Sequence, residues 1–459
     1  MKARGAPAQV VEQALYEVRK AIHPRAVHGW FAGWRWALVW ATQIVFYGLA
    51  WLPWNGRQAV LFDIAHRKFT IFGLVFFPQD IIYLTVLLVI AALSLFLFTA
   101  VAGRLWCGYA CPQTVYTEIF LWVEEKIEGD RPARLKLDAA PLSARKLALK
   151  VAKHGAWIAI ALWTGFTFVG YFTPIRELWH AVWSFSTGPW ETFWVLFYGF
   201  ATYGNAGWMR EQVCKYMCPY ARFQSAMFDP DTLIITYDRE RGEPRGKGKD
   251  KGHCVDCSIC VQVCPTGIDI RDGLQYECIG CAACIDGCDR VMEKVGFPKG
   301  LIRYSTTYAM EQKLTRAEMF KRAFRPRVLL YSAILWAIII AAGVALWNRV
   351  PLKVDVIRDR AAISRETAGG QIENVYRLQI MNTHESARRF DIGVAGLPGA
   401  TLAGEAAVVL DGAQARMVPV RVRVPAGALA PGTHPLAFTV RARDDAGVAV
   451  RERSVFIVR

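Results

Sequence analysis

The sequence is short of acidic side chains and confines its cysteines to one part of the chain. Its 39 Asp and Glu face 55 Lys and Arg, which gives a formal net charge of +16 over 459 residues. All 12 Cys lie from Cys107 to Cys288, so the remainder of the chain has none for a disulfide. Residues 1–35 lack a leading apolar region with a cleavage site, and we expect no cleaved signal peptide. The chain is nevertheless 54% hydrophobic with 17 Trp, which favours membrane-spanning helices combined with soluble domains.

Five uncharged stretches are long and apolar enough to cross a bilayer, which needs about 20 residues per helix. They are residues 36–54, 81–103, 155–175, 192–209 and 328–348. We therefore expect a multi-pass membrane protein with an α-helical bundle of five transmembrane helices, embedded in the lipid bilayer. Asp80 directly precedes the second stretch, where a carboxylate stabilises a helix start; a proton or ion group is the alternative.

The Lys and Arg residues between these stretches predict the orientation. Loop 104–153 contains nine of them, whereas loop 172–191 contains only Arg176. Basic loops stay in the cytoplasm. The segments expected in the cytoplasm are therefore residues 1–35, 104–153 and 211–327, and residues 352–459 are expected in the periplasm. Because the membrane topology accounts for the positive charge, we expect no nucleic-acid partner.

Two cysteine runs in residues 253–290 form the most specific motif. Each run has the spacing C-x2-C-x2-C-x3-C, the first from Cys254 and the second from Cys278. This spacing is typical of bacterial two-cluster ferredoxins, in which the fourth Cys of each run ligates the other cluster. We expect one 4Fe–4S cluster on Cys254, Cys257, Cys260 and Cys288, and a second on Cys278, Cys281, Cys284 and Cys264. Zinc is the alternative, but zinc sites usually use two separated ligand pairs. Two such clusters would relay electrons between a donor and an acceptor.

A second pattern occurs twice, after the second and fourth apolar stretches. Residues 107–112 and 214–219 both read C-x-Y-x-C-P, which indicates duplicated helical hairpins. On a helix, Cys107 and Cys111 share one face, as do Cys214 and Cys218. We expect Pro112 and Pro219 to end or kink each helix just after its pair. Four converging thiols suit Cu(I), zinc or a further iron–sulfur centre, with Met209 and Met217 nearby. Buried packing residues and a reversible dithiol are the alternatives.

Residues 352–459 have a different pattern, with short segments that alternate polar and apolar side chains. The clearest are residues 375–381, 416–424, 436–442 and 448–458, separated by Gly, Pro and Asp. They predict an antiparallel β-sandwich of about seven strands. Residues 239–252 are polar and charged without periodicity and are expected to form a linker.

Together these motifs resemble the CcoG/FixG family, also called RdxA/RdxB, whose members assist assembly of cbb3-type cytochrome oxidase. The matching stretches are FDIAHRKFTIFGLVFFPQD (62–80), GRLWCGYACPQTVYTEIF (103–120), EQVCKYMCPYARFQSAMFDPDTLIITYD (211–238) and PTGIDIRDGLQYECIGCAACIDGCD (265–289). NVYRLQIMNTH (374–384) resembles the family's immunoglobulin-like domain.

The resemblance implies a protein of the bacterial inner membrane that reduces Cu(II) to Cu(I) for insertion into the oxidase. It assigns electron transfer to the eight ferredoxin cysteines, and copper handling to Cys107, Cys111, Cys214 and Cys218. Oxidase subunits or copper-delivery proteins would be its partners. The resemblance does not identify the electron donor.

Two other functions fit the same motifs. A quinol-linked electron conduit of the membrane polyferredoxin type also carries CxxxCP pairs beside a ferredoxin module, although it would not need the β-domain. A non-enzymatic scaffold would present the β-domain to oxidase subunits and use the clusters for stability or sensing.

Overall fold

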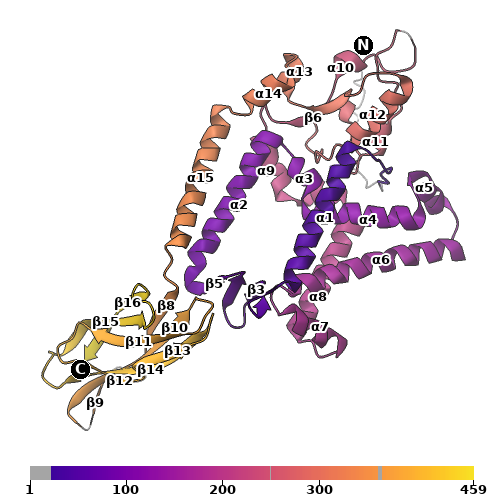
Figure 1. The fold of residues 1–459 in the computed structure, drawn as a ribbon. Helices are drawn as coiled ribbons and strands as arrows, with labels where there is room; N and C mark the ends of the chain where they lie inside the picture. The colour runs from indigo at the N-terminus through magenta and orange to yellow at the C-terminus, as the bar shows by residue number, and fades with distance from the viewer. Residues whose placement is uncertain (1–21, 249, 360–363, 368) are drawn as a thin grey trace, which may run out of the picture. The chain divides into compact units, whose positions relative to one another are not determined.

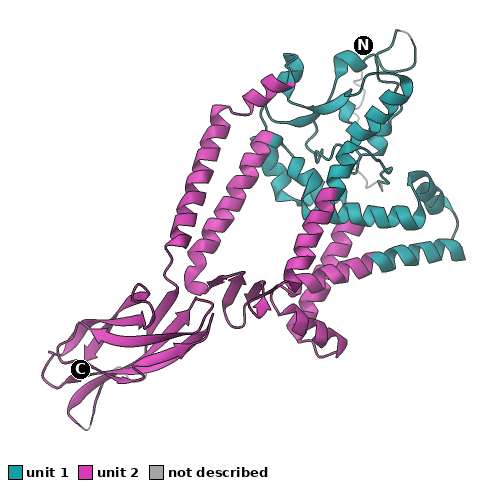
Figure 2. Ribbon diagram, in the orientation of Figure 1, with its two compact units in different colours: residues 1–36, 102–156, 209–315 teal, residues 37–101, 157–208, 316–459 magenta. Residues whose placement is uncertain are grey.

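The computed structural model describes residues 22–459 except 249, 360–363 and 368 (Figure 1). Most of the expected N-terminal segment 1–35 therefore lies outside the described residues. The chain forms two compact units that alternate along the sequence. Unit 1 comprises residues 1–36, 102–156 and 209–315, and unit 2 comprises residues 37–101, 157–208 and 316–459 (Figure 2).

Unit 1 contains the cysteine-rich part of the chain. One helix begins shortly after the second Cys of each run, and an antiparallel pair of strands, β6 and β7, flanks these helices. These elements are β6 Ile234–Tyr237, α10 Arg239–Gly242, α11 Ile259–Gln262, α12 Ala283–Val295, β7 Ile302–Ser305 and α13 Thr307–Glu311. Apolar side chains from both strands and from α12, such as Ile235, Met292 and Ile302, form one buried core with the cysteines. Strands β6 and β7 thus complete the core of the predicted module 253–290, and α10 gives the predicted linker one helical turn.

The other elements of unit 1 surround the two C-x-Y-x-C-P motifs. They are α3 Leu105–Tyr109, α4 Pro112–Glu128, α5 Arg131–Ala139, the first half of α6 Ala144–Val169, the π-helix η3 Val213–Met217 and α9 Pro219–Met227. The buried carboxylate of Glu124 joins several of them, because it pairs with Arg134 at 2.9 Å, Arg210 at 2.7 Å and Lys153 at 3.5 Å. These ion pairs connect α4, α5, α6 and the chain that leads into the second motif.

Every one of the five apolar stretches is helical. The helices are α1 Trp30–Trp51, α2 Ile81–Ala102, α6, α8 Pro189–Thr202 with its π-helical continuation η2 Tyr203–Met209, and α15 Pro326–Trp347. Among the described residues, two of these helices, Pro78–Ala102 and Pro326–Trp347, are long and apolar enough throughout to span a membrane. The contacts in unit 2 join α2 to α15, through Tyr83 and the carbonyl of Ala345, and α1 to α6, through Tyr47 and Thr164. A bundle of all five helices remains a prediction.

A small sheet that the sequence analysis did not anticipate precedes α2. Strands β3 Val60–Asp63, β4 Lys68–Ile71 and β5 Leu74–Phe76 form an antiparallel meander, next to the pair β1 Pro53–Trp54 and β2 Arg57–Gln58. Asp80 accepts a hydrogen bond from the backbone of Phe77 at 3.2 Å, which confirms its position as a carboxylate at the start of α2. It also pairs with Arg349 at 2.5 Å and Lys353 at 3.4 Å.

The C-terminal part of unit 2 is a β-sandwich, which confirms the predicted β-domain. One sheet has the order β12-β14-β10-β8, with β9 beside β10, and the other has the order β13-β11-β15-β16. The strands are β8 Leu352–Arg358, β9 Arg365–Glu366, β10 Gln371–Asn382, β11 Arg388–Ala395, β12 Thr401–Gly404, β13 Ala407–Leu410, β14 Ala415–Pro425, β15 Gly432–Ala442 and β16 Ala449–Val458. The alternation in β14 buries Val418, Val420, Val422 and Val424 in the core.

The sandwich contacts the β1–β2 pair beside the small sheet through Glu385. This carboxylate accepts hydrogen bonds from Arg57 at 2.7 Å, from Trp54 Nε1 at 3.1 Å and from Asn55. Buried Val75 and Phe77 also pack with Met381 and Ala413 of the sandwich. With the Asp80–Arg349 pair, these contacts give the sandwich two attachments to the residues around α2.

Candidate functional site

All twelve cysteines are free thiols in unit 1, and the eight ferredoxin cysteines form two groups. Burial and, to a smaller extent, Cys260, Cys257 and Cys254 of the first run together raise the pKa of the Cys288 thiol to about 12. Burial, with smaller contributions from Cys281 and Cys264, likewise raises the pKa of Cys278 to about 12. Thiols influence one another in this way only at short range. Each run therefore lies close to the fourth Cys of the other run, and which cysteines ligate which cluster stays a prediction.

The backbone of both runs suits a compact inorganic cluster. The residues before and after the second Cys of each run have positive φ: Asp256 at 52° and Ser258 at 55° in the first run, Gly280 at 69° and Ala282 at 59° in the second. Such conformations are unfavourable for most residues and usually mark sites where the chain wraps a ligand. The two runs differ in sequence at these positions but share the same backbone conformation. The ligands that the spacing assigns to each cluster are all cysteine thiols. The residues present thus fit two 4Fe–4S clusters.

The four cysteines of the C-x-Y-x-C-P motifs also lie together, and we call them the four-thiol site. Burial and, to a smaller extent, the nearby Cys111, Cys107 and Cys218 thiols together raise the pKa of Cys214 to about 12. The pKa of Cys107 is raised by burial to about 11. The Gln224 amide, which is fully buried, lies 3.4 Å from Cys107 Sγ. The convergence that the repeat predicts is therefore present. Among the described residues, no three Cys, His, Asp or Glu side chains have the spacing of a site for one ion.

The expected position of the two prolines is wrong. Each helix ends before the second Cys of its motif, and Pro112 and Pro219 are the first residues of the next helices, α4 and α9. Cys111 and Cys218 are extended N-cap residues, with ψ of 129° and 111°. The reason is that the residue before proline avoids the helical region, whereas proline itself suits the first position of a helix. The paired thiols consequently do not share one helix face.

The first motif lies directly against the second ferredoxin run. A Cβ added to Gly108 would lie 2.7 Å from the Cα and backbone N of Cys281. On the opposite side of the contact, a Cβ on Gly280 would lie 3.1 Å from the carbonyl of Arg104. Helix α3 and this cluster-binding loop therefore touch through bare backbone. Cys107 and Cys214 both pack against the ferredoxin core.

Two buried arginines, which the sequence analysis did not single out, flank the second run. Arg35 donates a hydrogen bond to the carbonyl of Cys281 at 3.3 Å and lies 3.7 Å from Glu118. Arg104 donates to the carbonyl of Ala221 at 2.6 Å, which joins α3 to α9. Both side chains are about 6% exposed. Burial raises the pKa of the Cys281 and Cys278 thiols, and the positive charges of Arg35 and Arg104 respectively oppose that effect. The partners of Arg35 are far away in sequence, so no local pattern could have identified it.

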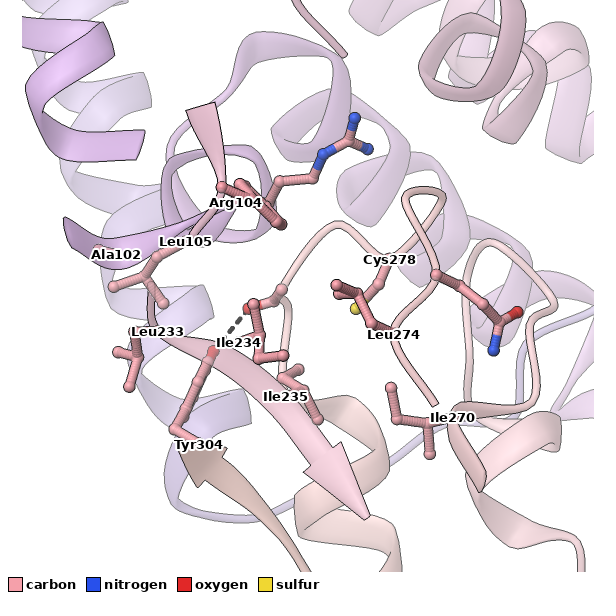
Figure 3. Close-up of a pocket in the computed structure, with 13 residues that line it drawn as sticks. Ala102, Arg104, Leu105, Leu233, Ile234, Ile235, Ile270, Leu274, Cys278 and Tyr304 are labelled. Atoms are coloured by element: carbon pink, nitrogen blue, oxygen red, sulfur yellow. Dashed lines mark hydrogen bonds between the residues drawn. The ribbon is translucent and has the colours of Figure 1, made fainter. Parts of the chain in front are cut away.

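A small apolar cavity adjoins Cys278 (Figure 3). Its volume is about 20 Å³, which is room for about one water molecule. The Tyr304 hydroxyl, which donates a hydrogen bond to the carbonyl of Gly280 at 2.5 Å, lines it together with Arg104 and Leu274 (Figure 3).

Three families match parts of the chain. A 4Fe-4S dicluster domain matches residues 209–307, which contain both ferredoxin runs and the second motif. A 4Fe-4S binding domain matches residues 84–129, which contain Cys107 and Cys111. The family described as an IG-like fold at the C-terminal of FixG matches residues 342–459.

Full-length relatives give the same result. The chain is 38% identical to the nitrogen fixation protein FixG of Rhizobium meliloti over 437 residues, covering 86% of this chain and 83% of FixG. It is 40% identical to protein RdxA of Cereibacter sphaeroides over 418 residues, covering 87% and 88% of the two chains. The ferredoxin-type protein NapH of Haemophilus influenzae is 24% identical over 218 residues, covering 44% of this chain and 66% of NapH. The chain therefore belongs to the FixG/RdxA/RdxB family and is an iron–sulfur electron-transfer protein.

Proposed function

We propose that the chain is a membrane-bound cupric reductase, which converts Cu(II) to Cu(I) at the four-thiol site with electrons from the ferredoxin module. One observation carries the proposal: Gly108, the neighbour of Cys107, touches the backbone of Cys281. Electron transfer through protein slows steeply with distance, so contact between the two sites supports rapid transfer between them. Each electron that reaches the four-thiol site reduces one Cu(II), and the reaction needs no bond to break.

The side chains at the four-thiol site suit the product of this reaction. Thiolates are soft ligands that favour Cu(I). The pKa of Cys107 is raised to about 11 and that of Cys214 to about 12, so both thiols are protonated near neutral pH without metal. Copper binding must then displace these protons and draw the thiols closer together. When bound, the two clusters would supply single electrons. One cluster would be held by Cys254, Cys257, Cys260 and Cys288, and the other by Cys278, Cys281, Cys284 and Cys264.

The surrounding chain supports a place in the bacterial inner membrane. Helices α2 and α15 have the length and composition of membrane spans. The basic loop 104–153 supports a cytoplasmic position for the N-terminus and the ferredoxin module, and hence a periplasmic position for the sandwich. The family resemblance adds the destination of the copper, the cbb3-type oxidase, with oxidase subunits or copper-delivery proteins as partners.

The test uses the full chain, purified anaerobically in detergent and containing about eight iron atoms, as two cubanes require. After reduction, Cu(II) is added with a Cu(I)-specific chelator, and the cluster signals are followed by electron paramagnetic resonance. We expect the reduced-cluster signals to disappear as an equal amount of Cu(I) forms. The variant Cys214→Ser/Cys218→Ser should keep its iron and lose this reaction. Clusters that stay reduced in the presence of Cu(II), or an undiminished rate in the double variant, would refute the proposal.

A quinol-linked electron conduit is the second candidate, supported by the partial similarity to NapH. Reduction of the clusters by a soluble quinol analogue, without any reaction with Cu(II), would favour this candidate. Normal oxidase assembly by a variant without clusters would instead favour a scaffold that acts through the sandwich.

A further inference from the structure

The two C-x-Y-x-C-P motifs have the same pattern but different surroundings. In the first motif Gly108 and Tyr109 are buried, and the Tyr109 side chain is 8% exposed. At the same positions of the second motif, Lys215 is half-buried and Tyr216 is 52% exposed, and the next residue, Met217, is 54% exposed. Although the four thiols converge, the two halves of the site therefore face different environments.

The first motif faces the ferredoxin module. Gly108 permits the backbone contact with Cys281, and any larger side chain at this position would separate the two. The Tyr109 hydroxyl lies 3.4 Å from that of Tyr304, which in turn donates a hydrogen bond to the carbonyl of Gly280. Both links end on the loop that would bind the second cluster. The second motif has Lys215 where the first has Gly108, and a lysine could not make this close approach.

The second motif combines exposure with soft donor atoms. Met217 stands between Cys214 and Cys218, and its equivalent in the first motif is Ala110, which has no donor atom. Residues 213–217 form a π-helix rather than the α-helix of the first motif. Such π-helical turns are uncommon and often occur at functional sites. Thioether sulfur binds Cu(I) and is adaptable in its geometry.

We propose that the two motifs divide the work of the four-thiol site: the first receives electrons from the ferredoxin module, and the second exchanges the metal ion with the surroundings through Met217. This division rests on the proposed function and adds a direction to it. Electrons enter from the side of Gly108 and Tyr109. Copper arrives and leaves on the side of Tyr216 and Met217, where a receiving protein could reach it.

The exchange half is tested without any redox step. The anaerobic full-length protein is loaded with Cu(I), and transfer to bicinchoninate is followed in wild type and Met217→Ala. Loss of one soft ligand on the exchange route should change the transfer rate about tenfold, which corresponds to a single weak contact. The matched control is Met417→Ala, because Met417 is 45% exposed but lies in the sandwich. A rate for Met217→Ala that equals those of wild type and the control overturns this half.

The electron half is tested with substitutions at equivalent positions of the two motifs. In Gly108→Ala the added Cβ must push α3 away from Cys281, and we expect Cu(II) to reoxidise the reduced clusters about tenfold more slowly, since small displacements cost large factors in rate. Lys215→Ala, which places the same residue in the second motif, should react at the wild-type rate. Iron content of each variant is measured first. If Gly108→Ala loses iron, the pair Tyr109→Phe and Tyr216→Phe replaces it, with slower reoxidation expected for Tyr109→Phe alone.

The outcomes separate the two proposals. If the clusters of the wild type are reoxidised by Cu(II) but equivalent substitutions in the two motifs have equal effects, the division of labour fails and the reductase stands. If Met217→Ala alters Cu(I) transfer but wild-type clusters do not react with Cu(II), the reductase fails and the exchange route stands.

Discussion

Substitution of Glu124 by glutamine tests the buried ion pairs that hold the four-thiol site. The Glu124 carboxylate is about 4% exposed and pairs with Arg134, Arg210 and Lys153. Lys153 also contacts the neighbouring Glu128, at 3.0 Å. Removing one partner of a buried pair leaves uncompensated charge and typically costs about 3 to 5 kcal/mol. We expect a loss of this size in the free energy of unfolding of unit 1 in Glu124→Gln.

The same substitution should change the response to acid. Burial alone would raise the pKa of Glu124, but Arg210, Lys153 and Arg134 outweigh this effect and lower it below the usual value. A carboxyl group whose pKa is lower in the folded state stabilises the fold near neutral pH, and this contribution disappears as the pH falls through the lowered pKa. Glu124→Gln should therefore lose stability at neutral pH and show a weaker decrease at acid pH than wild type.

The assay follows the visible absorbance of the bound clusters in urea, because the clusters are lost when unit 1 unfolds. The control is Glu293→Gln in the same unit, where the ion pair with Lys299 is exposed and 3.4 Å long. Exposed pairs contribute less than about 1 kcal/mol. Equal unfolding midpoints for Glu124→Gln and Glu293→Gln would refute the role assigned to the buried network.

Three further predictions concern the metal sites and the sandwich. Arg35→Gln removes a positive charge beside Cys281 and should lower the reduction potential of one cluster only, as measured by redox titration with paramagnetic resonance. The control is Arg131→Gln, because Arg131 donates a hydrogen bond to the carbonyl of His23; this variant should leave the reduction potential unchanged. Asp80→Asn leaves Arg349 without its buried partner and should destabilise unit 2 by about 3 kcal/mol, seen as faster proteolysis between α15 and the sandwich; an unaltered digestion pattern would contradict it. Because the raised pKa values of Cys107 and Cys214, about 11 and about 12, keep these two thiols protonated, Cu(I) affinity should rise with pH through the neutral range. Competition with a chelator measures this affinity, and a flat profile would show that protons are not displaced.

The sequence predicts best where spacing alone carries the chemistry. The spacing of the two ferredoxin runs predicts which cysteines share a cluster, because a cubane accepts few arrangements of the chain, and this assignment stays a prediction. The alternation of valines in β14 specifies which of its faces is buried, since successive side chains of a strand point to opposite sides. The repeated C-x-Y-x-C-P motif likewise predicts that Cys107 and Cys214 approach each other.

Other features depend on contacts that no local pattern encodes. Arg35 contacts Cys281 although the two residues lie far apart in the sequence. The strands β1 to β5 are too short to show a clear alternation of polar and apolar side chains. Apolar composition indicates the length of a helix but not its neighbours, so the arrangement of the five helices could not be derived. By contrast, the start of α4 at Pro112 follows a local rule, because proline favours the first position of a helix.

The two attachments of the sandwich determine how it can move. A domain joined to a helix by one flexible connection can swivel about that connection. Here Arg349 and Glu385 fix two separate points. One lies next to the end of α15, and the other is the contact with the β1–β2 pair that precedes α2. A protein that binds the sandwich and exerts a force on it would therefore transmit that force to α2 and α15 together. The sandwich would not rotate about a single flexible connection.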